Sequence, residues 1–275
     1  MVEPTVVTDR FHRYDDFDSQ FVAGRRVDVW LPPGYDEGGR TYPVIYAQDG
    51  QNLFDPATAY VGIPWGLQDA ISRLAQEDSD LAAIVVGIWN TPDRIPEYMP
   101  QKPLGGSRYR HIRERFAERY GQAPISDDYL RFMSAELKPE IDGTFRTRPS
   151  PASSVLLGSS MGALISLYGF CEYPDSFGKA VCMSTSWTIA GKSVLSYLRD
   201  HIPSPRTRKA YFDYGSEAQI GAYEKLQHET DRLFHRHGYR RDVTYMVQRF
   251  PGDAHSEEAW RDRVEVPLRF ILGNG

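Results

Sequence analysis

Short apolar runs alternate with helical stretches along most of this 275-residue chain. The runs at 43–48 (PVIYAQ) and 81–89 (LAAIVVGIW) are apolar at successive positions, as in strands that are buried on both faces of a sheet. An earlier run, 26–31 (RVDVWL), alternates with a period of two residues and ends at a Pro-Pro-Gly turn, which predicts an antiparallel strand. Further strands are predicted at 153–158, 179–184, 209–215 and 242–248, and helices at 66–76, 126–142, 161–172, 218–237 and 257–272.

This order of elements predicts an α/β fold with a mostly parallel central sheet and helices on both of its faces. In such a sheet the ligand site lies at the carboxyl ends of the strands. No internal repeat, low-complexity tract or Gly/Ser-rich linker interrupts the sequence, so we expect one domain over residues 1–275. The segment 91–125 breaks the alternation, because it is rich in Pro, Arg and Tyr and too long for an ordinary connection. It is predicted to be a lid or a substrate-binding insertion.

The composition is that of an ordinary globular protein, with 41% hydrophobic and 25% charged residues. A formal net charge of -5 argues against binding to nucleic acid or to an anionic membrane, since both need a basic protein surface. Cys171 and Cys182 are predicted to be core thiols. The amino terminus lacks a signal-peptide pattern and no apolar run could span a bilayer, so we expect a cytoplasmic enzyme. A secreted protein whose signal peptide has been removed is the alternative.

The segment 155–164 (VLLGSSMGAL) contains a GxSxG motif between an apolar strand and an amphipathic helix. So sharp a turn leaves no room for a Cβ at the two glycines, and it lifts the hydroxyl of Ser160 out at the edge of the sheet. The backbone N–H of Met161 then points at the oxyanion that forms during acyl transfer. We therefore predict that Ser160 is a nucleophile. The alternative is a packing turn without chemistry.

A serine hydroxyl attacks only when a base takes its proton, so the chain should supply a histidine beyond the predicted nucleophile. Of the seven histidines, His255 lies in a turn-rich loop, 250–260 (FPGDAHSEEAW), directly after the last predicted strand. A base on that loop can reach the carboxyl edge of the sheet. The other six lie in a charged helical stretch or precede or flank the strands. We predict His255 to be the general base, and a loop histidine that caps the final helix is the alternative.

The third catalytic group should be a carboxylate that orients the imidazole and stabilises the imidazolium. The run 213–217 (DYGSE) ends a predicted strand and lies between nucleophile and base in the sequence. We favour Glu217, because it lies past the glycine turn, whereas Asp213 is expected to belong to the strand. Asp253 and Glu257 flank the histidine and could orient it instead.

Acyl transfer needs a second N–H donor for the oxyanion. Residues 49–52 (DGQN) follow an early buried strand, and Gly50 lets the backbone bend closely, so the N–H of Gln51 is the predicted donor. A plain Asp-Gly turn is the alternative. The sequence has no HExxH motif and no clustered His/Cys spacing. The predicted chemistry requires no metal and no organic cofactor, and we expect none.

Together these segments resemble the putative-esterase family of α/β-hydrolases, which includes enterochelin, feruloyl and acetylxylan esterases and the mycobacterial mycolyltransferases. The segments that carry the resemblance cover nearly the whole chain: VDVWLPPGYD (27–36), DGQNLFD (49–55), VVGIWNTPDRIPEY (85–98), DDYLRFMSAELKPEID (127–142), LLGSSMGALISLY (156–168) and PGDAHSEEAW (251–260). The resemblance implies the α/β-hydrolase fold, with Ser160 as nucleophile, His255 as base and the Gln51 and Met161 amides as oxyanion hole. Related sequences often carry a further Asp shortly after the Gly-Ser/Thr-Glu turn, which this chain lacks, and this departure favours Glu217.

Within 91–125, seven basic side chains stand against four acidic ones, a local balance of 7 - 4 = +3 in an acidic chain. We predict that this insertion recognises a small-molecule ester that is anionic or polyhydroxylated, with Arg94 and Tyr98 nearest the pocket. Asn52 and Trp65, in and after the DGQNLFD block, are also predicted to contact substrate. A solvated helix face with Arg–Glu pairs is the alternative explanation of the local charge.

The predicted function is that of a serine esterase, which hydrolyses a carboxylic ester through an acyl-enzyme on Ser160. An acyltransferase is the first alternative, because it would use the same residues but pass the acyl group to an alcohol. A catalytically silent hydrolase fold used for binding is the second. It is disfavoured because nucleophile, base and oxyanion donors are all predicted.

Overall fold

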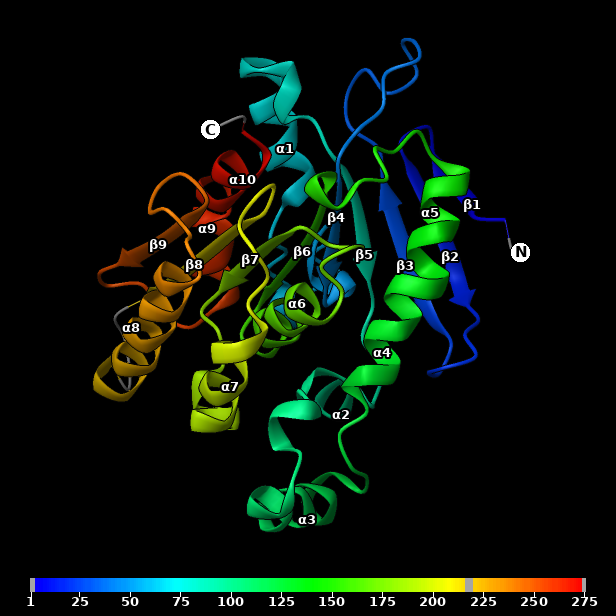
Figure 1. Ribbon diagram of the computed structural model, residues 1–275. Coiled ribbons are helices and arrows are strands. Elements are labelled where there is room, and N and C mark those ends of the chain that lie inside the picture. Colours follow the sequence, from blue (N-terminus) through cyan, green and yellow to red (C-terminus); the bar gives the residue numbers. More distant parts are fainter. Residues whose placement is uncertain (1–2, 216–219, 274–275) are drawn as a thin grey trace.

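The computed structural model describes residues 3–215 and 220–273. Over these residues a nine-stranded sheet runs through the centre of the molecule, in the order β1-β2-β3-β5-β4-β6-β7-β8-β9 (Figure 1). The strands are β1 (Thr5–Thr8), β2 (Phe11–Phe17), β3 (Arg25–Trp30), β4 (Val44–Gln48), β5 (Ile84–Ile88), β6 (Ser154–Ser159), β7 (Lys179–Met183), β8 (Lys209–Gly215) and β9 (Tyr245–Phe250). Pairing is antiparallel from β1 through β3 to β5, and parallel from β5 to β9. The prediction of an α/β fold with a mostly parallel sheet is confirmed.

Helices cover both faces of this sheet (Figure 1). The α-helices are α1 (Leu67–Glu77), α2 (Arg94–Tyr98), α3 (Arg110–Tyr120), α4 (Ser126–Phe132), α5 (Lys138–Thr144), α6 (Met161–Glu172), α7 (Trp187–His201), α8 (Ile220–Arg236), α9 (Glu257–Arg263) and α10 (Glu265–Leu272). Helices α4 to α8 belong to one core layer, and α1, α9 and α10 to the other. None of the helices in the described ranges is long and apolar enough to cross a membrane.

The parallel strands contribute to both core layers, because successive side chains of a strand point to opposite faces. In β4, Tyr46 joins the layer of α4 to α8, whereas its neighbour Ile45 joins the layer of α1, α9 and α10. Every residue of β4 and β5 is buried, which explains why their sequences are apolar apart from Gln48 at the end of β4. Cys171 and Cys182 are buried free thiols in the first of these layers, as predicted.

Two of the predicted helices are interrupted, and a proline lies just after each break. The stretch 126–142 consists of α4, a π-helical turn (Met133–Leu137) and α5, with Pro139 in the first turn of α5. The stretch 257–272 divides into α9 and α10, and Pro267 lies in the first turn of α10. Proline has no N–H for the bond that a helix interior needs, so it is accepted at the start of a helix.

The N-terminal hairpin of β1 and β2 and the helix α7 were not predicted from the sequence. Strand β1 is exposed along its whole length, so its sequence shows no alternation of apolar and polar residues. Helix α7 starts without a capping side chain and contains Gly191 at φ 54° and ψ -138°, which interrupts the helical periodicity. Strand β1 and helix α7 therefore lack the local signals from which the other strands and helices were predicted.

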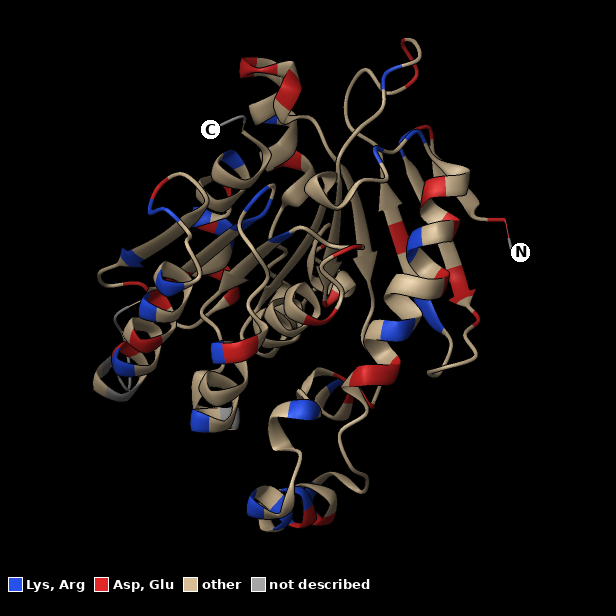
Figure 2. Ribbon diagram, viewed as in Figure 1, with Lys and Arg blue, Asp and Glu red and all other residues tan. Residues whose placement is uncertain are grey.

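The insertion 91–125 contains the helices α2 and α3, with α3 farthest from the sheet (Figure 1). Figure 2 shows basic and acidic residues side by side on α3. Arg110 and Glu114 form an exposed ion pair there, with 2.7 Å between Nε and Oε1. This pairing agrees with the alternative explanation of the local charge, a solvated helix face with Arg–Glu pairs.

Candidate active site

Strand β6 leads into helix α6 through a sharp turn at Ser160. The backbone of this residue (φ 53°, ψ -117°) is uncommon for a residue with a side chain. A Cβ added to Gly158 would overlap the carbonyl group of Gly162, so the first glycine of the motif cannot be replaced without a backbone shift. The N–H of Ser160 donates to the carbonyl of Met183 (2.9 Å), which ties the turn to the end of β7. The GxSxG segment thus lies in the strand–turn–helix context that the sequence predicts.

The imidazole of His255 lies against the hydroxyl of Ser160, with 3.0 Å between Nε2 and Oγ. The histidine belongs to the loop between β9 and α9, so two residues far apart in sequence meet at the carboxyl edge of the sheet. Desolvation, and after it the positive charge of Arg263, lower the pKa of His255. A neutral imidazole at this distance from a hydroxyl can accept its proton.

A second hydroxyl, that of Ser186, also contacts Ser160, with 2.9 Å between the two Oγ atoms. The N–H of Ser186 donates to the backbone carbonyl of Ser160 (3.1 Å). Sequence reasoning missed this residue, although a signal was present. The polar run 184–186 directly follows β7, the strand beside β6, and the ends of neighbouring parallel strands meet at the same edge of a sheet.

The predicted oxyanion donors lie on two segments that pack against each other. Gln51 belongs to a short 3₁₀ turn after β4, and Met161 is the first residue of α6, where backbone N–H groups lack partners within the helix. A Cβ added to Gly162 would lie 3.2 Å from a carboxylate oxygen of Asp49, so the two segments touch near this point. Both amides are therefore at the carboxyl edge of the sheet, and their donation to an oxyanion stays a prediction.

Arg94 and Tyr98, predicted to lie nearest the substrate, hold Asp49 in place. The guanidinium of Arg94 donates through Nε (2.6 Å) and Nη2 (2.8 Å) to the two carboxylate oxygens of Asp49. The hydroxyl of Tyr98 accepts the N–H of Asp49 (3.2 Å), and Tyr98 is 0% exposed. Asp49 has a left-handed backbone (φ 56°) and directly precedes the turn that carries Gln51. In this structure both side chains support the segment 49–52, which carries the predicted Gln51 donor and is called the oxyanion loop below.

Asn52 and Trp65, the other predicted substrate contacts, also have partners inside the protein. The side-chain oxygen of Asn52 accepts the N–H of Tyr60 (2.9 Å). The indole of Trp65 is 1% exposed and donates to the carboxylate of Glu257 (3.2 Å). A direct contact between substrate and the side chain of Trp65 or Tyr98 would need these buried groups to become accessible, and their role in substrate binding stays a prediction.

Each described alternative for the catalytic acid binds a group other than His255. Asp213 lies in β8, fully buried, and pairs with Arg263 (2.9 Å). Asp253 pairs with the same guanidinium (2.8 Å). Desolvation raises the pKa of Glu257, the acceptor of the Trp65 indole, to about 7. Glu217, the favoured acid, lies outside the described residues.

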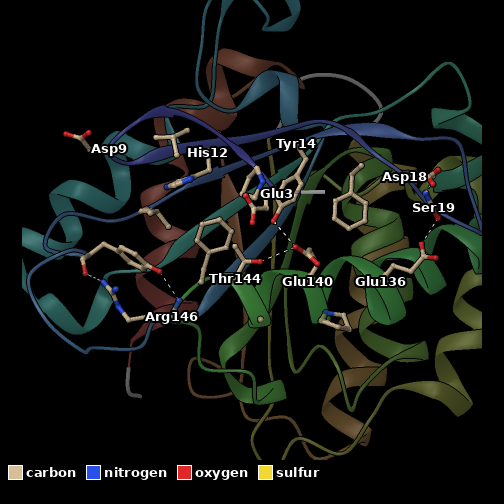
Figure 3. A pocket seen from close by; sticks show the side chains of 18 of the residues that line it. Glu3, Asp9, His12, Tyr14, Asp18, Ser19, Glu136, Glu140, Thr144 and Arg146 are labelled. Atoms are coloured by element: carbon tan, nitrogen blue, oxygen red, sulfur yellow. Dashed lines mark hydrogen bonds between the residues drawn. The ribbon is translucent and has the colours of Figure 1, made fainter. Parts of the chain in front are cut away.

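A cavity of about 1270 Å³ lies elsewhere, between the N-terminal hairpin and α5 (Figure 3). Ser160 and His255 do not line it, and two of its acidic groups accept hydrogen bonds from neighbouring hydroxyls. The hydroxyl of Tyr14 donates to Glu140 (3.3 Å), and that of Ser19 to Glu136 (2.6 Å). We therefore place the candidate active site at Ser160, where the predicted nucleophile and the predicted base meet, and not in this cavity. Across the described ranges, no group of three or more His, Cys, Asp or Glu residues could hold a metal ion.

The chain is similar to known proteins over almost its whole length. Residues 22–271 match the family described as "Putative esterase". An uncharacterized protein of Bacillus subtilis (strain 168), YbbA, is 26% identical over 202 residues, which are 72% of this chain and 71% of YbbA.

Two solved structures show the same fold. The enterobactin esterase FES from Shigella flexneri, solved in the presence of enterobactin, has a TM-score of 0.69 and 14% identity over 98% of this chain and 60% of its own. An IroE-like serine hydrolase from Shewanella oneidensis has a TM-score of 0.66 and 18% identity over 95% of this chain and 78% of its own. This chain thus spans about three fifths of the length of the enterobactin esterase. At these identities, the likeness to the two structures establishes the fold.

Proposed function

The chain belongs to the family described as "Putative esterase", and we propose that it hydrolyses a carboxylic ester through an acyl-enzyme on Ser160. Membership of this family supports ester hydrolysis in general. The observation that carries the serine mechanism is the 3.0 Å contact between Ser160 Oγ and His255 Nε2 at the tip of a GxSxG turn. The fold that the chain shares with an IroE-like serine hydrolase agrees with it.

In the proposed reaction, Ser160 Oγ attacks the ester carbonyl carbon while His255 Nε2 takes the hydroxyl proton. The N–H groups of Gln51 and Met161 bind the oxyanion. As the tetrahedral intermediate collapses, the imidazolium gives its proton to the leaving alcohol, and the acyl group stays on Ser160. Water then attacks the acyl-enzyme, again with His255 as base, and the acid product leaves as Ser160 regains its proton.

Glu217 remains our proposed partner for the imidazole. Asp213 and Asp253 bind Arg263, and Glu257 accepts the indole N–H of Trp65, so these three carboxylates have other roles in the described structure. These bonds support Glu217, which follows Gly215 in the sequence, as the acid.

We propose a small-molecule ester as substrate, as for the structural neighbour that was solved with enterobactin. The sequence pointed to an anionic or polyhydroxylated ester through Arg94. Because both carboxylate oxygens of Asp49 compensate the charge of this guanidinium, a polyhydroxylated ester fits the site better than one recognised by its charge.

Hydrolysis of p-nitrophenyl acetate and labelling by a fluorophosphonate test the proposal. Ser160→Ala should abolish labelling and lower kcat by at least about 10⁴-fold, and His255→Ala should lower kcat by a similar factor. Ser134→Ala is a matched control, because Ser134 lies on the π-helical turn before α5 and donates to the carbonyl of Arg131. Wild-type hydrolysis by the Ser160→Ala protein would rule out the serine mechanism.

The same residues could pass the acyl group to an alcohol, as in the acyltransferase alternative. Product analysis with added alcohol acceptors separates the two reactions. An esterase releases the free acid at a rate that acceptors do not change, whereas an acyltransferase forms a new ester in their presence.

A further inference from the structure

Arg263, in α9, joins three segments at the carboxyl edge of the sheet. The side chain is 3% exposed. Its Nη2 lies 2.9 Å from Asp213 Oδ1 and 2.9 Å from Ser184 Oγ, and its Nη1 lies 2.8 Å from Asp253 Oδ2. These partners come from β8, from the end of β7 and from the loop that carries His255. One guanidinium therefore binds the histidine loop to the ends of two core strands.

The fit between this loop and β8 is close. A Cβ added to Gly215, the last residue of β8, would overlap the carbonyl group of Asp253. The loop thus lies directly on the end of the strand, with the bond from Arg263 to Asp253 beside this contact. A displacement of the loop would have to break this ion pair.

Trp260 provides a second connection from α9 to the imidazole. Its indole Nε1 donates to Ser184 Oγ (3.1 Å), the same atom that accepts from Arg263. The Trp260 ring packs edge-to-face against His255, with 5.0 Å between centroids and an interplanar angle of 81°. Ser184 has a left-handed backbone (φ 46°), which turns the chain at the end of β7. The position of the imidazole thus depends on bonds that meet at Ser184 Oγ.

We infer that Arg263 is a positioning residue that holds His255 over Ser160. Its guanidinium is fixed by the buried Asp213 and binds the histidine loop through Asp253. This inference rests on the proposed function, because it assigns Arg263 a role in the reaction of Ser160 and His255. Asp213, at the strand end that precedes the proposed acid, then serves the guanidinium and not the imidazole.

The charges around the loop give this role a distinct electrostatic signature. In the described residues the charged groups beside His255 are Arg263 and Glu257 from α9, Asp253 from its own loop and Asp213 from β8. Both aspartates are bound to Arg263, and the pKa of Glu257 is raised by desolvation. Desolvation is the main cause that lowers the pKa of His255, and the positive charge of Arg263 lowers it further, so both favour the neutral imidazole that acts as base.

Asp253→Asn is the main test, because Asp253 is partly exposed (34%) and the buried pair of Arg263 and Asp213 stays intact. We expect kcat and the rate of fluorophosphonate labelling to fall by about 10- to 100-fold, with KM and Tm nearly unchanged, because the charge-assisted bond from Arg263 is replaced by a weaker bond to a neutral amide and holds the histidine loop less firmly. Asp262→Asn is the matched control on the same helix, since Asp262 is exposed and pairs with Arg261. It should behave as wild type.

Arg263→Lys and Arg263→Gln separate positioning from charge. Lysine keeps the charge but cannot bind three partners in one plane, so kcat should fall while the acid limb of the kcat/KM profile keeps its wild-type pH. Glutamine removes the charge, so the pKa of His255 should rise and the acid limb should move to higher pH. If either protein fails to fold because Asp213 is left unpaired, Asp253→Asn decides alone.

Wild-type kcat and labelling in Asp253→Asn would overturn the inference. That result is distinct from a failure of the proposed function. If Ser160→Ala is inactive while Asp253→Asn is unimpaired, only the role of Arg263 is wrong. If Ser160→Ala retains full activity, the serine mechanism is wrong and the role of Arg263 falls with it.

Discussion

Replacing Tyr98 with phenylalanine should lower both stability and turnover while leaving substrate affinity unchanged. The Tyr98 hydroxyl accepts the N–H of Asp49 (3.2 Å), and the two residues are 0% and 2% exposed. Phenylalanine keeps the ring and its packing but removes the acceptor. The N–H of Asp49 then stays buried without this partner, next to the turn that presents the Gln51 amide.

The expected size of the effect follows from this burial. A buried donor without a partner costs about 1–3 kcal/mol. At about 2.1 cal/mol/K per residue, 275 residues unfold with an entropy of about 0.58 kcal/mol/K, so Tm should fall by about 2–5 °C. A slight displacement of the Gln51 amide should lower kcat by about 10-fold, less than the 10²- to 10³-fold loss of a whole oxyanion donor.

Thermal unfolding and steady-state kinetics on a p-nitrophenyl ester measure both quantities. Tyr46→Phe is the matched control, because the Tyr46 hydroxyl is buried in β4 and has no partner among the described residues. Removing it should leave Tm unchanged or raise it slightly. A raised KM in Tyr98→Phe, with Tm and kcat at wild-type values, would refute the supporting role and restore Tyr98 as a substrate contact.

Two further substitutions test the groups around the oxyanion loop. The pKa of Glu257 is raised from 4.5 to about 7, so the folded protein holds a proton there that the unfolded chain loses, and stability falls as the pH rises between these values. Glu257→Gln should therefore raise the free energy of unfolding at pH 8 by on the order of 3 kcal/mol, seen as a higher Tm, and should change it little at pH 5. Equal shifts of Tm at both pH values would contradict this. Arg94→Ala should lower kcat on neutral and anionic esters alike, because Asp49 loses its ion-pair partner and, among the described residues, keeps only the amide of Asn90 on its carboxylate, while Arg110→Ala should not. A rise in KM confined to anionic esters would show instead that Arg94 recognises charge.

Much of the fold could be predicted because burial on both faces of a strand leaves a local pattern. The apolar runs at 43–48 and 81–89 became β4 and β5, and the GxSxG segment became the turn between β6 and α6. Helix α7 and strand β1 escaped prediction, since Gly191 interrupts the periodicity of the helix and β1 has no buried residue. A sequence pattern predicts a helix or strand only where its buried residues recur at a regular spacing, so elements without such a spacing are missed.

The sequence alone determined the chemical types at the candidate site: a hydroxyl at a constrained turn, Ser160, and a histidine on the loop after the last strand, His255. Only the tertiary structure decided the partners of the charged side chains. Arg94 binds Asp49, and Arg263 binds Asp213, although 45 and 50 positions separate the two members of each pair. Such pairing depends on how loops from different strands meet at one edge of the sheet, and periodicity within a single segment carries no record of it.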